Sequence, residues 1–370
     1  MAARAKALKA QGKPIIDFTA GEPDVDTPQH IKQAAIHAIN EGFTKYTPSS
    51  GMPQLREAVA ARLSRQIRTT VEPAQVIITC GAKHALYNIL QVLCQRGDDV
   101  IIPSPYWLSY PPLVTMAEGT PRVVPTDETR GFVPDLDQLN AAITKQTKAI
   151  ILNSPSNPTG VVYDQRLLQQ IAELAVRHQL WVISDEIYDA LVFPPHTHVS
   201  IASLGPAIAA RTIVVNGVSK AYAMTGWRIG YLAAPQPIAE AIDRLQSHST
   251  SNPTSISQKA ALAALTGDQA CVAEMARAFE ERRDRVVELL RQIKGVSGVP
   301  PGGAFYAFLN ISRLGLKAHE VSRRWLEELF VATVPGESFG SDRHVRMSFA
   351  TSLASVEEGL KRIGEWVSKR

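Results

Sequence analysis

Short apolar segments alternate with amphipathic helical segments between residues 75 and 233, and this alternation restricts the fold more than any other feature of the sequence. Most of the apolar segments are apolar along their whole length, which is typical of strands covered on both faces. Strands that alternate with helices predict an open α/β sheet, mainly parallel, seven-stranded and sandwiched by helices. The strands are expected at 75–80, 100–102, 122–124, 148–152, 181–184, 212–215 and 229–233, and the helices at 82–95, 106–117, 135–143 and 164–179.

The remainder of the chain predicts a second, smaller domain. A chain of 370 residues is too long for one ordinary core. Strand patterns at 303–310, 330–334 and 343–349, with helices at 318–329 and 355–368, indicate a small α+β layer. Because chain termini often lie close together, we expect the N-terminal segment to pack with it. We therefore predict a large domain at 29–267 and a small domain formed by 1–28 and 268–370.

Composition excludes several classes of function. Charged residues make up 20% of the chain and the net charge is +4, with no basic tract interleaved with aromatics, so no nucleic acid partner is expected. No apolar run approaches the roughly 20 residues that span a bilayer, and the N-terminus has no signal-peptide core, so no membrane association is expected. Cys80, Cys94 and Cys271 form no CxxC pair. This pattern favours reduced thiols in a cytoplasmic protein and predicts no metal site.

Polar residues follow the ends of several predicted strands. Gly81 opens a helix after the first strand, and Asn157 follows the strand at 148–152. Asp185 and Tyr188 follow the next strand, and Lys220 follows the strand at 212–215. Each alone has a simpler reading, since a glycine is often only a turn and an aspartate after a strand is often a helix N-cap. Because ligands collect at the carboxyl ends of parallel strands, the set predicts one site.

The chemistry of these residue types indicates pyridoxal phosphate (PLP). A lysine just past a buried strand loses solvent, which lowers its pKa and frees a nucleophilic amine, although Lys220 can also be read as a solvated surface lysine. Arg228 lies in a small-residue context that lets a phosphate approach. An amine with a phosphate-binding cation suggests a PLP Schiff base. Asp185 would keep the pyridine nitrogen protonated, and Tyr188 and Asn157 would hydrogen-bond the ring oxygen.

Two further residues have open alternatives. Trp107 offers a flat face for stacking on a cofactor ring, but a core tryptophan fits the composition equally well. Arg346 alternates with apolar neighbours on a predicted strand and is suited to gripping a carboxylate with two parallel hydrogen bonds. On its own pattern, Arg346 is more simply a surface arginine.

Nearly the whole chain resembles the class I (fold-type I) PLP-dependent aminotransferases, in particular the bacterial aspartate and aspartate/prephenate branch. The order of the motifs makes the resemblance specific for the fold and for PLP, and less specific for the substrate. The motifs are Thr19-Ala20-Gly21-Glu22-Pro23-Asp24, Thr44-Lys45-Tyr46, Gly81-Ala82-Lys83, Ser104-Pro105-Tyr106-Trp107, Asn153-Ser154-Pro155-Ser156-Asn157-Pro158-Thr159-Gly160, Ser184-Asp185-Glu186-Ile187-Tyr188, Ser219-Lys220 through Gly230, and Val345-Arg346-Met347-Ser348.

The resemblance implies a role for each matching residue. Lys220 is implied as the Schiff-base lysine and proton shuttle, with Asp185 at the pyridinium. The other implied cofactor contacts are Tyr188 and Asn157 at the ring oxygen, Trp107 stacked on the ring, and Gly81, Ala82, Lys83, Ser219 and Arg228 around the phosphate. The implied substrate contacts are Gly21 and Arg346 at the α-carboxylate, Lys83 at the distal carboxylate of aspartate or glutamate, and Trp107 and Asn157 nearby. Tyr46 is implied to reach the phosphate of a neighbouring subunit, which implies a homodimer with shared active sites.

The expected activity is therefore ping-pong transfer of an amino group from aspartate or glutamate to 2-oxoglutarate or another 2-oxoacid. Alternatives on the same fold are an aromatic, neutral or broad-range aminotransferase and a β-eliminating lyase. A PLP-binding regulator would need an added DNA-binding domain, for which the space before Gly21 is too short. Two departures from the family stand out. Family members carry a further N-terminal segment linked to prephenate use, and His84 replaces a glutamine, where we expect a role on the helix surface.

Overall fold

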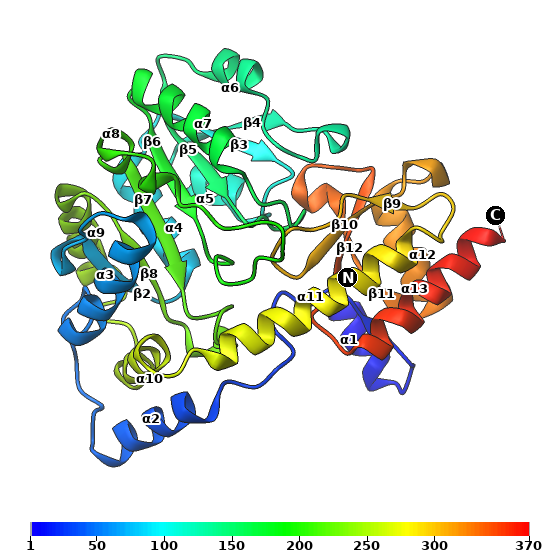
Figure 1. The fold of residues 1–370 in the computed structure, drawn as a ribbon, viewed down its shortest axis with the longest axis horizontal. Coiled ribbons are helices and arrows are strands. Elements are labelled where there is room, and N and C mark those ends of the chain that lie inside the picture. Colours follow the sequence, from blue (N-terminus) through cyan, green and yellow to red (C-terminus); the bar gives the residue numbers. More distant parts are fainter. Residues whose placement is uncertain (1, 370) are drawn as a thin grey trace.

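The fold is built on a seven-stranded sheet with the strand order β2-β8-β7-β6-β5-β3-β4, seen in the computed structural model, which describes residues 2–369 (Figure 1). β8 pairs antiparallel with both of its neighbours, and the remaining pairs are parallel. The predicted fold class is confirmed. The strands are β2 (Val76–Thr79), β3 (Asp99–Ser104), β4 (Thr120–Pro125), β5 (Thr147–Asn153), β6 (Trp181–Asp185), β7 (Thr212–Gly217) and β8 (Gly230–Ala233).

Helices cover both faces of this sheet, because successive side chains of each strand point to opposite faces. In β6, Ile183 packs into the cluster formed by one set of helices, and Val182 packs into the cluster on the other side. The first face carries α4 (Ala82–Leu93), α5 (Tyr110–Met116) and α9 (Gln236–Ser249). The second carries α3 (Pro53–Ile67), α6 (Leu136–Ala142), α7 (Gln165–Arg177), α8 (Pro206–Ala209) and α10 (Ser255–Thr266).

A second layer is built around the four-stranded sheet β12-β13-β10-β9. α11 runs from beside α10 to beside α13, and both chain ends lie on the side of this layer (Figure 1). The elements are α1 (Ala2–Ala10), α11 (Ala270–Leu290), β9 (Ser297–Gly298), β10 (Tyr306–Asn310), α12 (Ala318–Leu329), β11 (Val331–Ala332), β12 (Val334–Pro335), β13 (His344–Ser348) and α13 (Leu353–Ser368).

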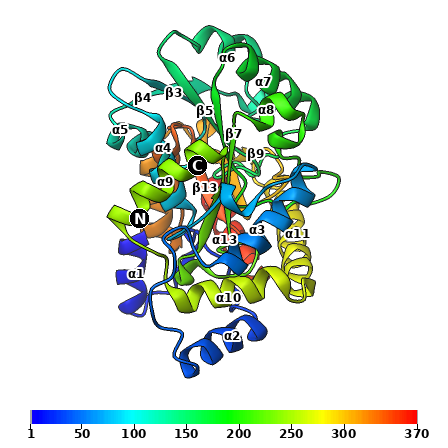
Figure 2. The same cartoon turned by 90° about the vertical axis from the view of Figure 1, so that its left-hand side faces the viewer.

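The N-terminal segment is attached to this layer through β1 (Ile16–Asp17), which pairs in parallel with β11. α2 (Gln29–Asn40) packs instead against α10, beneath the large sheet (Figure 2). The division into domains at 28/29 and 267/268 stays a prediction. Within residues 2–369, no helix is both long enough and apolar enough to cross a membrane.

Differences from the expected elements are confined to short segments. The helix expected at 106–117 begins only at Tyr110. The strand expected at 330–334 is divided into β11 and β12, which belong to different sheets. β9 and α8 were not expected, because two to four residues are too few to show a periodic pattern.

Candidate active site

A cavity of about 500 Å³ lies at the carboxyl ends of β5, β6 and β7, between the two layers. This is the sheet edge at which the sequence predicted a site. Most of the predicted site residues line the cavity, and Gly81 and Tyr46 are not among its lining residues. Those that line it are Gly21, Ala82, Lys83, Trp107, Asn157, Asp185, Tyr188, Ser219, Lys220, Arg228 and Arg346.

Lys220 follows β7 and extends into the cavity. Its Nζ donates a hydrogen bond of 2.6 Å to the carbonyl oxygen of Gly21. Burial lowers the pKa of Lys220 to about 8, and this effect outweighs the attraction of Glu22, which raises it. Arg228 lowers it further. Lys220 is therefore not a solvated surface lysine, and its amine exchanges a proton near neutral pH.

Asp185 is the last residue of β6 and is 4% exposed. Its Oδ2 accepts a hydrogen bond of 2.7 Å from the hydroxyl of Tyr110, and its carbonyl oxygen accepts one of 3.0 Å from Asn153 Nδ2. Burial raises the pKa of Asp185 to about 6, against the opposing effect of the Tyr110 hydrogen bond. A turn follows β6, so the N-cap reading is wrong.

Arg346 lies on β13 and is 5% exposed, so the surface reading is wrong for this residue. Its Nη1 donates to Asn157 Oδ1 at 3.0 Å, and its Nη2 donates to the carbonyl oxygen of Thr19 at 3.1 Å. Its guanidinium lies 4.4 Å from the ring centroid of Tyr306, whose hydroxyl is 3.0 Å from that of Tyr188. Nε finds no hydrogen-bond partner within residues 2–369. A buried guanidinium with an unpaired donor is suited to an anionic ligand.

Gly81 and Arg228 form the opposite end of the site. Gly81 has a φ of +86°, and a Cβ there would lie 2.4 Å from Arg228 Nη2, so only glycine allows the guanidinium to pack against this loop. Arg228 is held by hydrogen bonds of 2.9 Å to the carbonyl oxygen of Thr225 and 3.2 Å to that of Cys80. α4 begins at Ala82, and the first turn of a helix presents backbone N–H groups to an anion.

Trp107 and Lys83 lie together on one wall. Lys83 Nζ is 4.9 Å from the ring centroid of Trp107, and the Trp107 ring meets the Tyr110 ring edge-on at 5.4 Å. His84 is half-buried, and its Nδ1 accepts a hydrogen bond of 3.2 Å from the backbone N–H of Cys80. The expected surface role of His84 is therefore wrong, because the side chain closes the loop before α4.

Tyr46 stands apart from the other predicted residues. It lies in the loop between α2 and α3, its side chain is 90% exposed, and it does not line the cavity. The structure of one chain does not bring it to the site.

Sequence reasoning missed other residues of the cavity wall. Tyr110 follows Trp107 by three residues, a spacing that places both on one face if the helix is predicted to include them. Tyr306 gave no such signal, because it lies in an apolar strand that reads as core. Glu22 also lines the cavity and accepts a hydrogen bond of 2.6 Å from Thr225 Oγ1.

These residues fit pyridoxal phosphate. A buried carboxylate, Asp185, lines the cavity on one side, and Arg228, which packs against Gly81 beside the N-terminus of α4, lines another. The amine of Lys220, whose pKa is lowered, opens into the same space. The three groups match the pyridine nitrogen, the phosphate and the aldehyde of the cofactor.

Comparison with known proteins agrees with this geometry. Residues 13–363 match the family described as aminotransferase class I and II. The chain is 49% identical to the aspartate aminotransferase of Geobacillus stearothermophilus, over 99% of this chain and 95% of the relative. It is 44% identical to a probable aspartate/prephenate aminotransferase of Thermus aquaticus, over 98% of this chain and 94% of that protein.

Solved structures give the same result. The aspartate aminotransferase from Thermus thermophilus with maleate superposes with a TM-score of 0.95 at 42% identity, covering 98% of this chain and 94% of that one. The aspartate aminotransferase from Rhizobium meliloti superposes with a TM-score of 0.95 at 41% identity, covering 99% and 94%. On this full-length similarity the chain belongs to the class I and II aminotransferases, and it is a pyridoxal phosphate-dependent transaminase.

Proposed function

We propose that this transaminase uses dicarboxylic amino acids, aspartate or glutamate, as amino donors and 2-oxoglutarate or another 2-oxoacid as acceptor. The observation that carries the proposal is a pair of cations, Lys83 and Arg346, that both line the same cavity. Two cations complement the two carboxylates of such a substrate. The relatives named aspartate aminotransferase support it, and the Thermus thermophilus structure was solved with maleate, itself a dicarboxylate.

The cofactor is assigned to the part of the cavity between Asp185 and Arg228. When bound, it supplies an electron sink for the negative charge that develops at the substrate Cα. Asp185 is proposed to hold a proton at the pyridine nitrogen, and Tyr188 and Asn157 to donate hydrogen bonds to the ring oxygen. Trp107 is proposed to stack on the ring. The phosphate is assigned to Ser219, Arg228 and the backbone of Gly81, Ala82 and Lys83.

Lys220 is proposed as the residue that carries the cofactor and moves the proton. An amine with a pKa of about 8 accepts and releases a proton near neutral pH, as a general acid and base must. Gly21 and Arg346 are proposed to orient the α-carboxylate, so that the Cα proton faces Lys220. Burial of Arg346 supports this, since a fixed guanidinium loses little entropy on binding.

Substrate choice is tested with Lys83→Ala and a panel of amino donors against 2-oxoglutarate, read by oxoacid formation. The proposal expects a loss of about tenfold or more in kcat/KM for aspartate and glutamate, with neutral and aromatic donors little changed. Lys145 lies outside the cavity, so Lys145→Ala serves as a control. An equal effect of Lys83→Ala on all donors would contradict the proposal. Pyruvate and ammonia formed without an acceptor would indicate elimination instead.

A homodimer in the cytoplasm is proposed as the working form. Exposure of Tyr46 on the single chain supports a partner that covers it. Mixing Tyr46→Ala chains with Lys220→Ala chains tests this directly. If Tyr46 serves the site of the other subunit, a mixed dimer combines both defects in one site and leaves the second intact, so activity returns. Absence of recovery in verified mixed dimers would rule out sharing.

A further inference from the structure

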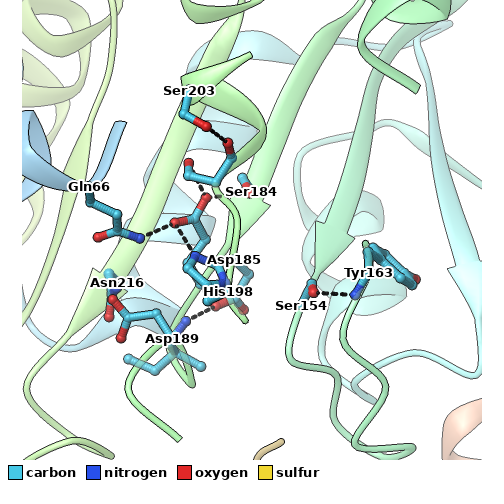
Figure 3. A network of polar contacts seen from close by, with 12 residues as sticks. Gln66, Ser154, Tyr163, Ser184, Asp185, Asp189, His198, Ser203 and Asn216 are labelled. Atoms are coloured by element: carbon cyan, nitrogen blue, oxygen red, sulfur yellow. Dashed lines mark hydrogen bonds and ion pairs between the residues drawn. The ribbon is translucent and has the colours of Figure 1, made fainter. Parts of the chain in front are cut away.

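A buried carboxylate, Glu186, follows Asp185 in sequence and takes no part in the roles above. Its side chain is 1% exposed. As an acceptor-only group it needs several donors to be stable away from water, and it has them. Gln66 and His198 converge on it from different elements (Figure 3). Its contacts are Ser184 Oγ at 2.9 Å and Ser200 Oγ at 2.6 Å to Oε1, and Gln66 Nε2 at 2.7 Å and His198 Nε2 at 3.0 Å to Oε2.

The alternation of side chains at the end of β6 explains how consecutive carboxylates reach opposite faces. Asp185 points to the face of α5, where it meets Tyr110. Glu186 points to the face of α3, where it meets Gln66. Glu186 therefore anchors the segment 185–188, at the end of β6, from the face opposite the cavity, while Asp185 and Tyr188 line the cavity.

His198 is the cationic side of this cluster. The charged groups that face it are Glu186, Asp189 and Arg62, and Arg62 is itself paired with Asp189 at 2.9 Å. Burial lowers the pKa of His198, but Glu186 and Asp189 together raise it above its ordinary value despite Arg62. The raised pKa favours the charged form of His198, and its cause is the pair of carboxylates that face the ring. When it is protonated, His198 balances the charge of Glu186 at a distance of 3.0 Å.

Asp185 precedes Glu186 in the sequence, so the charge of Glu186 acts on the pKa of Asp185. The pKa of Asp185, raised mainly by burial, is lowered by the hydrogen bond from Tyr110, raised by the negative charge of Glu186, and lowered by Lys220. Removing the charge of Glu186 should therefore lower the pKa of Asp185. Removing the positive charge of His198 should leave Glu186 unbalanced and raise it.

We propose that Glu186 and His198 are positioning residues for Asp185, which hold its turn in place and set the pH below which Asp185 takes up a proton and no longer pairs with the cofactor's pyridine nitrogen. This rests on the role proposed above for Asp185. The pair touches neither cofactor nor substrate, since neither residue lines the cavity. It acts through charge on the opposite face of the sheet.

The test measures binding of 4′-deoxypyridoxine phosphate to the apoenzyme between about pH 5 and pH 8. This probe has the pyridine ring and phosphate but no aldehyde, so it binds without reacting at Lys220. The inference expects Glu186→Gln to move the acid limb of binding to lower pH. His198→Gln, which keeps an N–H toward Glu186 without the charge, should move it to higher pH. At the acid end of the range, the affinity should be about threefold higher than wild type for Glu186→Gln and about threefold lower for His198→Gln.

Opposite shifts separate charge tuning from simple damage. A purely structural role would weaken binding in both variants at every pH, and that result would overturn the inference. Glu128→Gln is the matched control, because Glu128 faces His344 at 3.3 Å in a second Glu–His pair away from the cavity. It should leave the curve unchanged.

Asp185→Asn distinguishes failure of the inference from failure of the underlying role. If Asp185 faces the pyridine nitrogen, this variant binds the probe weakly, and its binding curve lacks the acid limb that titration of Asp185 causes. An unchanged curve would refute the role of Asp185. A lost limb in Asp185→Asn, with Glu186→Gln and His198→Gln curves that match wild type, would refute the inference alone.

If either Glu186→Gln or His198→Gln does not fold, the titration of the His198 imidazole in wild-type apoenzyme, followed by NMR, decides. A midpoint above the ordinary 6.5 supports the pair, and one below it contradicts the pair.

Discussion

The buried wall of the cavity and its open rim are built in different ways. On the buried wall, Asp185 and Arg346 are almost fully enclosed and held by hydrogen bonds within the chain. On the rim, Lys83 and Arg228 are exposed, and Tyr46 lies outside the cavity altogether. The wall is preorganised by contacts within the chain, whereas Lys83 and Tyr46 are left exposed on the chain. Substitutions on the wall should therefore cost more than substitutions on the rim.

The largest effect is expected at Lys220, which extends into the cavity. Lys220→Ala removes both the proposed attachment point and the proposed proton carrier, and turnover should fall by about 10⁴-fold or more. Single-turnover kinetics with purified holoenzyme provide the measurement. Pyridoxal phosphate should still bind without a covalent bond. Retention of wild-type turnover would refute the role of Lys220.

A smaller loss is expected at Arg346. Arg346→Lys keeps the charge but removes the planar pair of donors, and kcat/KM for amino donors should fall by about 100-fold. The loss should appear mainly as a higher KM, with kcat little changed, because Arg346 already binds the carboxylate before the reaction begins. Steady-state kinetics, with Arg343→Lys as an exposed control on the same segment, test this. Equal effects of the two substitutions would show that burial does not matter here.

Tyr110→Phe should have an intermediate effect through Asp185. The hydrogen bond from Tyr110 lowers the pKa of Asp185, so its loss raises that pKa and moves the acid limb of activity to higher pH. At pH 6 the loss should be about tenfold, shrinking as the pH rises through 8. A pH profile of kcat/KM measures it. A loss that is independent of pH would indicate damage to packing instead.

The smallest effect is expected at the rim. Tyr46→Phe removes one hydroxyl, and cofactor affinity should fall by about fivefold, the value of one ordinary hydrogen bond. Equilibrium dialysis of pyridoxal phosphate against the apoenzyme measures this affinity. A loss as large as that at Arg346 would erase the distinction between wall and rim.

The sequence predicted the wall and the rim unequally. The strands of the large sheet were predicted because most of them are continuous apolar runs, and the ends of those runs placed Asp185 and Lys220 at one edge. Burial of Arg346 was not predictable from its own strand, since alternation does not say which face is covered. The covering residue, Tyr306, comes from a different strand.

The contact between Glu186 and His198 could not be predicted from the sequence, for a different reason. Glu186 and His198 are separated by a loop without periodic pattern, and a charged residue next to a predicted site reads as solvated. Their contact depends on the packing of α3 and the loop at 196–200 against the end of β6. Such tertiary contacts are set by the assembled fold and leave no local signal.

The covalent link between cofactor and chain tests the account most directly. Holoenzyme reduced with sodium borohydride and digested for mass spectrometry should carry the phosphopyridoxyl group on the peptide that contains Lys220, and Lys220→Ala should carry none. Modification at another lysine, or no modification of a protein that binds the cofactor, would contradict the assignment of the site.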